Sequence, residues 1–81
     1  MTSGASDAHA PAGGNDHIVR MANQIAVALL SVDDPEAATV EHIRSFWDPR
    51  MRRQLQSVLD AGGHGLEPVA REAAMRLAAL R

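Results

Sequence analysis

Three acid–proline pairs constrain the fold of this chain more than any other feature: Asp34-Pro35, Asp48-Pro49 and Glu67-Pro68. An acidic side chain just before a helix accepts free amides of the first turn, and proline suits the first helical position, which needs no donor. Each pair therefore predicts the start of a helix. The predicted helices cover about residues 34–47, 48–60 and 67–80.

A further helix is predicted ahead of these. It begins at Asn15 or Asp16, either of which can act as a cap, and ends at about Ser31. Its apolar residues recur at the spacing of one helix face: Ile18, Met21, Ala22, Ile25 and Leu29. Val19 and Val27 widen this face, so we expect the helix to contact something beyond its own domain.

The other helices show apolar stripes, and two segments break the pattern. The predicted inner faces are Val40, Ile43 and Trp47; Met51, Leu55, Val58 and Leu59; and Val69, Ala70, Ala73, Leu77 and Leu80. Gly62 to Gly65 predict a sharp reversal, because glycine accepts left-handed backbone conformations. Residues 1–14 are small and polar without periodicity, which predicts a disordered tail. The chain is thus expected to be all-α: a small bundle of about four short helices in one domain, residues 15–81.

Composition indicates a small core. The chain has 81 residues, and its apolar residues are dominated by alanine. About twenty large apolar side chains, set against roughly 1.5 kcal/mol of ordering entropy per residue, give a net stability near zero. We therefore expect the chain to need a partner.

Charge is unevenly distributed. The net charge is −2, every basic residue is arginine, and residues 1–47 are acidic whereas residues 48–81 are mildly basic. This asymmetry suits complementary docking and falls short of the basic balance of a nucleic-acid-binding protein. The longest apolar run, Ile25 to Leu30, is too short to cross a bilayer, and the N-terminus lacks the features of a signal peptide. A soluble, cytoplasmic protein is expected.

The segment Phe46 to Arg53 is the strongest candidate docking surface. It joins the chain's two aromatic residues to Arg50, Arg52 and Arg53, which stand where the helix dipole disfavours cations. Trp and Arg are the residues in which binding energy most often concentrates. The alternative is that Phe46 and Trp47, or at least one of them, belong to the core and the arginines form a solvated face. The predicted partner-binding residues here are Phe46, Trp47, Arg50, Arg52 and Arg53.

Asn23 and Gln24 are polar residues in the middle of an apolar helix, and they complete the predicted partner-binding set. They are either a solvent-facing pair, or one of them binds the backbone of a partner, because an unpaired buried amide costs about 1–3 kcal/mol.

Residues for catalysis or metal binding are not predicted in this chain. It contains no cysteine, which rules out thiolate ligation of zinc or of an iron–sulfur cluster. His17, His42 and His64 lack the spacing of a metal site, and no serine lies in a nucleophile motif.

Three segments resemble a known family. They are Arg20 to Ala26, Phe46 to Arg52, and Gly62 to Pro68 followed by Arg71-Glu72-Ala73. Together they resemble the delta subunit of soluble NAD-dependent formate dehydrogenases, over about residues 17–80. The segment around Trp47 is the most specific. Two positions depart from the family pattern: Leu29-Leu30, where the family often has aromatic residues, and Glu67, where it has Asp before the proline.

The resemblance implies a non-catalytic subunit of a cytoplasmic enzyme that oxidises formate to carbon dioxide. It implies that the complex holds a molybdenum or tungsten pterin cofactor, iron–sulfur clusters, FMN and NAD, and that this chain binds none of them. The implied partners are the catalytic (alpha) subunit and the beta and gamma subunits, with no nucleic acid and no membrane. The implied role is to stabilise the complex or to assist maturation of the catalytic subunit.

Two other hypotheses stay open at this point. One is a small helical DNA-binding protein that uses Arg50, Arg52 and Arg53, for which strongly salt-dependent binding would be diagnostic. The other is a free-standing assembly chaperone, which would leave the finished complex on stringent washing.

Overall fold

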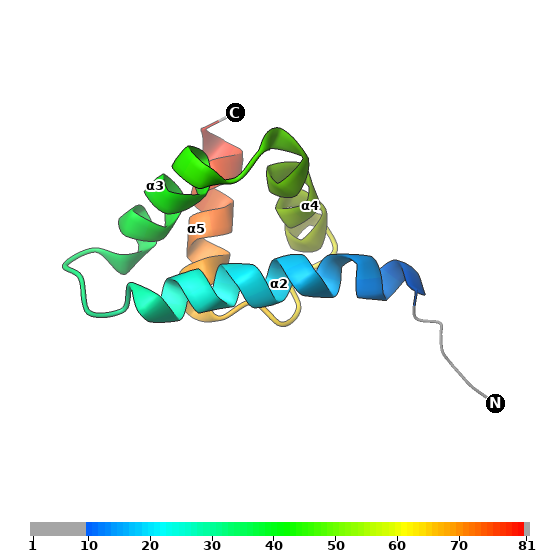
Figure 1. The fold of residues 1–81 in the computed structure, drawn as a ribbon, viewed down its shortest axis with the longest axis horizontal. Coiled ribbons are helices and arrows are strands. Elements are labelled where there is room, and N and C mark those ends of the chain that lie inside the picture. The colour runs from blue at the N-terminus through cyan, green and yellow to red at the C-terminus, as the bar shows by residue number, and fades with distance from the viewer. Residues whose placement is uncertain (1–9, 81) are drawn as a thin grey trace.

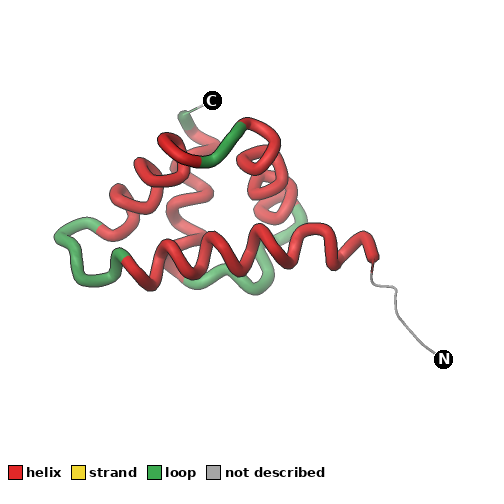
Figure 2. Tube along the Cα trace, in the orientation of Figure 1, coloured by secondary structure: helices red, strands yellow, loops and turns green. Residues whose placement is uncertain are grey.

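The computed structural model describes residues 10–80, which form helices joined by loops, with no strand in this part of the chain (Figure 2). The helices are α2 (Ala10–Ala28), α3 (Pro35–Phe46), α4 (Pro49–Asp60) and α5 (Pro68–Ala79). The predicted all-α fold of four short helices is confirmed.

Two of the acid–proline helix starts are confirmed in atomic detail. The Asp34 carboxylate accepts the amide of Ala37 at 3.1 Å, and the Asp48 carboxylate accepts the amide of Met51 at 2.8 Å. Glu67 also precedes its helix, but its side chain makes no capping hydrogen bond. A glutamate carboxylate lies one methylene further from the backbone, which makes it a poorer cap than aspartate.

The predicted start of the first helix needs correction. Helix α2 begins at Ala10, ahead of Asn15 and Asp16, and it ends at Ala28 before the predicted Ser31. Pro11 is tolerated because it lies in the first turn, where its missing N–H has no partner to lose. Of the predicted tail, residues 10–14 are therefore helical, and residues 1–9 lie outside the described part of the chain.

Helix α2 forms the base of the molecule. Figure 1 shows it lying across the other three, with which it packs, while α3 and α4 meet at a corner and spread apart toward α2. Helix α5 lies behind this corner and packs against both α3 and α4. The α3–α4 corner is the Trp47-Asp48 junction, where one helix ends and the Asp48 cap begins the next.

The core lies where the four helices meet, and much of it is alanine. Its buried residues are Ile18, Ala22, Ala26, Ile43, Trp47, Leu55, Val58, Leu66, Ala70 and Ala74. The buried alanines of α2 and α5 fill little volume themselves. Larger buried residues such as Ile43, Trp47 and Leu55 therefore supply much of the core. Most of the predicted inner faces are confirmed, but Leu80 is 60% exposed at the end of α5.

None of the described helices combines the length and the apolar character needed to span a membrane.

Candidate functional site

The two neighbouring aromatic residues have opposite environments. Trp47 is 5% exposed and belongs to the core, whereas Phe46 is 74% exposed. On the surface of α3 the Phe46 ring lies beside His42, with ring centroids 4.8 Å apart. A partner can therefore reach Phe46 but little of Trp47, which matches the core alternative for one of the two aromatics. Binding of a partner by either residue stays a prediction.

The three predicted arginines of α4 separate in space. Arg52 and Arg53 line a groove, and Arg50 is exposed on the same helix without contributing to its lining. The groove gains a third cation from Arg44 of α3, which the sequence analysis did not single out. No periodic signal links Arg44 to Arg52 and Arg53, because these side chains reach one groove only through the packing of α3 and α4 against α5.

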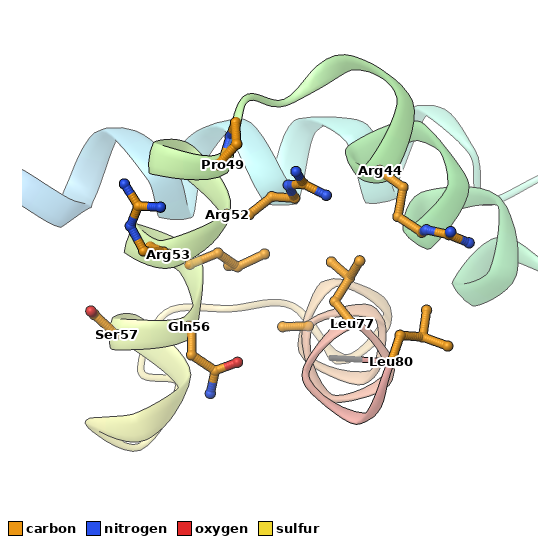
Figure 3. A pocket seen from close by; sticks show the side chains of 10 residues that line it. Arg44, Pro49, Arg52, Arg53, Gln56, Ser57, Leu77 and Leu80 are labelled. Carbon is orange, nitrogen blue, oxygen red and sulfur yellow. The ribbon is translucent and has the colours of Figure 1, made fainter.

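The groove is formed by three helices and has a volume of about 700 Å³. Figure 3 shows Arg53, Arg52 and Arg44 along one side, with Leu77 and Leu80 of α5 across from them and Gln56 and Ser57 extending from α4. Its remaining lining residues are Pro49, Leu55 and Ala74. The surface thus combines guanidinium groups with aliphatic side chains.

The electrostatics of the groove are one-sided. Its lining contains three arginines and no Asp or Glu, although the chain as a whole has a net charge of −2. The ion pairs among the described residues belong to Arg76, which lies 3.8 Å from Asp34 and 3.3 Å from Glu72. Within residues 10–80, Arg52 Nε is buried without a hydrogen-bond partner. The groove therefore offers three guanidinium donors without a carboxylate in its lining.

Asn23 has an internal role that the sequence analysis did not foresee. Its Nδ2 donates to the Gly65 carbonyl at 2.8 Å, and its Oδ1 accepts the Glu67 amide at 2.8 Å. Both partners belong to the turn between α4 and α5, so the side chain fastens this turn to α2. Gln24, by contrast, is exposed.

Arg71 holds the same turn from the side of α5. Its two terminal nitrogens each donate at 3.2 Å, one to the Gly62 carbonyl and one to the Gly63 carbonyl. Gly63 has a φ of +68°, and a Cβ there would lie 3.2 Å from Arg71 Nη1. The predicted glycine reversal is confirmed. In the sequence, Arg71-Glu72-Ala73 contributes only to the family resemblance, and no local pattern predicts that Arg71 binds this turn.

The three histidines within residues 10–80 lie on separate elements. His17 is on α2, His42 on α3 and His64 in the turn after α4. Across residues 10–80, the structure contains no group of three or more His, Cys, Asp or Glu side chains that could hold a metal ion.

Fold and groove together define a small all-helical protein with one cationic, partly aliphatic concave surface. The family model described as "NADH-dependant formate dehydrogenase delta subunit FdsD" matches residues 17–74. The chain belongs to this family, and the resemblance found in the sequence is confirmed. No curated protein and no solved structure matches the chain. The matched residues include the arginines of the groove but end before Leu77 and Leu80.

Proposed function

We propose that this chain is a non-catalytic accessory subunit of a cytoplasmic NAD-dependent formate dehydrogenase. It binds the catalytic subunit, and it either stabilises the assembled complex or assists maturation of that subunit. Family membership supports an association with formate dehydrogenase subunits. The observation that carries the binding role is the groove, whose arginines have no acidic neighbour in its lining.

We propose that the cofactors of the enzyme lie in other subunits. The complex would hold a molybdenum or tungsten pterin cofactor, iron–sulfur clusters, FMN and NAD, which together carry electrons from formate to NAD. The residues of this chain do not fit an iron–sulfur cluster, because the sequence offers no thiolate. The Asn23 and Arg71 side chains are engaged with backbone groups of the α4–α5 turn.

The proposal is tested by producing the complex with and without this chain. With the chain present, we expect it to co-purify with the catalytic subunit. Without it, we expect a lower yield of assembled complex or a lower molybdenum or tungsten content per catalytic subunit, measured by elemental mass spectrometry. Stoichiometric retention after a high-salt wash would identify a structural subunit, and departure with a loss of metal content would identify a maturation factor.

The proposed function would be wrong if the chain failed to co-purify and its omission changed neither the yield nor the metal content. An activity assay with formate and NAD provides the third readout, since a complex lacking cofactor has lower activity per mole of catalytic subunit.

A further inference from the structure

We propose that the groove between α3, α4 and α5 binds an acidic amphipathic helix of a partner subunit. The helix would place carboxylates against Arg44, Arg52 and Arg53, and aliphatic side chains against Leu77 and Leu80. This inference rests on the proposed function for the identity of the partner. It adds the site on this chain and the chemistry of the segment that occupies it.

The arginines determine the charge of the occupant. Three guanidinium groups from two helices line one groove without a carboxylate among its lining residues. Like charges held together repel each other, and an acidic partner relieves this repulsion while it speeds association. Arginine presents a planar fork of donors that matches a carboxylate in two parallel hydrogen bonds.

Arg52 is the member of this set with the clearest need for an acceptor. Its side chain is half-buried and runs from α4 toward α3, and its Nε is buried with no partner in residues 10–80 (Figure 3). A buried donor without a partner costs about 1–3 kcal/mol. A carboxylate that pairs with the guanidinium would offset part of this cost, because the two groups carry opposite charges.

The leucines determine the apolar part of the occupant. Leu80 is 60% exposed and Leu77 is half-buried, and both lie across the groove from the arginines (Figure 3). A segment that meets both sides must carry acidic and aliphatic residues on adjoining faces. A helix with anchors at i, i+3 or i+4 provides this arrangement, and helices commonly lie in grooves of this kind.

This chain offers poor candidates for the occupant. Residues 1–9 contain a single acidic residue, Asp7, and no apolar side chain larger than alanine except Met1. That segment cannot neutralise three arginines and cover two leucines at once. The proposed occupant is therefore a helix of a different subunit.

Matched substitutions inside and outside the groove test it in the complete complex. Arg53→Glu and Leu80→Asp alter groove residues, and Arg20→Glu on α2 and Met75→Asp on α5 alter residues outside its lining. All four positions are exposed, so the fold should tolerate each change. We expect the groove variants to lose about tenfold or more in affinity for the partner subunits, and the controls to bind like the parent chain. Retention of the tagged chain is measured over a series of salt concentrations.

A photoreactive residue identifies the occupant. In the assembled complex, Ser57→p-benzoylphenylalanine places the probe at an exposed position in the groove lining. We expect the cross-linked peptide to come from a formate dehydrogenase subunit and to contain several acidic residues with aliphatic residues at helical spacing. Cross-linking to residues 1–9, to a second copy of this chain or to nucleic acid would overturn the proposal, as would the absence of any cross-linked peptide.

The two proposals fail in different ways. If the parent chain binds the other subunits and the groove variants bind equally well, the groove assignment is wrong and the accessory role stands. If the parent chain itself is not retained by the formate dehydrogenase subunits, the accessory role is wrong. The identity proposed for the groove's partner is then wrong as well.

Discussion

At the scale of single residues, two polar side chains hold the α4–α5 turn in place through hydrogen bonds to its backbone. Asn23 binds this turn from α2 through two hydrogen bonds of 2.8 Å, and Arg71 binds it from α5. These contacts join residues more than forty positions apart in the case of Asn23. The turn therefore depends on side chains from two helices as well as on its glycines.

Replacement of Asn23 should loosen this turn. We expect Asn23→Ala to lower the free energy of unfolding by about 1–2 kcal/mol, because two hydrogen bonds of about 1 kcal/mol each are lost. Hydrogen exchange at the Glu67 amide should become faster. Asn23→Asp should also be destabilising, since a carboxylate oxygen would face the Gly65 carbonyl. Gln24→Ala is the control, because Gln24 is exposed. Equal stability of Asn23→Ala and Gln24→Ala would contradict the prediction.

At the scale of the helices, the starts of α3 and α4 are better stabilised than the start of α5. The caps of α3 and α4 are aspartates with hydrogen bonds of 3.1 and 2.8 Å, whereas Glu67 caps nothing with its side chain. The amide of Glu67 is instead bound by Asn23. Helix α5 thus begins with a tertiary contact where the other two begin with a local one.

An aspartate at position 67 should improve the start of α5. We expect Glu67→Asp to raise the free energy of unfolding by about 0.5–1 kcal/mol, because its carboxylate can accept the Ala70 amide as Asp48 accepts that of Met51. Chemical denaturation followed by circular dichroism measures the change. The reciprocal variant, Asp48→Glu, should lose a similar amount, and two variants that moved in the same direction would count against the explanation.

At the scale of the whole molecule, the core is small and its helices leave apolar surface uncovered. Alanines make up much of the buried set, while Phe46, Leu80, Leu30 and Val27 are exposed. A core of this kind leaves little stability after the entropy of ordering is offset. Burial of the exposed side chains against a partner would add apolar area that the chain alone does not provide.

The isolated chain should therefore be marginally stable. We expect circular dichroism to show helix at low temperature and a broad melting transition, and the chain to melt at a higher temperature within the complex, because a partner that binds only the folded state stabilises it. The measurement compares the monomer at several concentrations with the purified complex. A sharp, cooperative transition at high temperature in the monomer would show that the core suffices by itself.

The sequence by itself determined the helical class, most of the helix boundaries and the family. Asp34, Asp48 and their prolines identify helix starts because the capping carboxylate and the amide it accepts lie three positions apart. Such interactions are complete within one turn of the chain. The sequence predicts too late a start for α2, because residues 10–14 carry no cap or periodic signal, and a helix extends outward from an established segment at little cost.

Only the tertiary structure decided which residues form the surface. Phe46 and Trp47 are adjacent, and the orientation of the α3–α4 corner over α5 places one outside and the other in the core. The fold also separates the neighbours Asn23 and Gln24, because Asn23 binds the α4–α5 turn while Gln24 is exposed. The groove joins Arg44, Arg52 and Leu80 from three helices. Its composition follows from how those helices pack, and packing brings together residues that no local spacing connects.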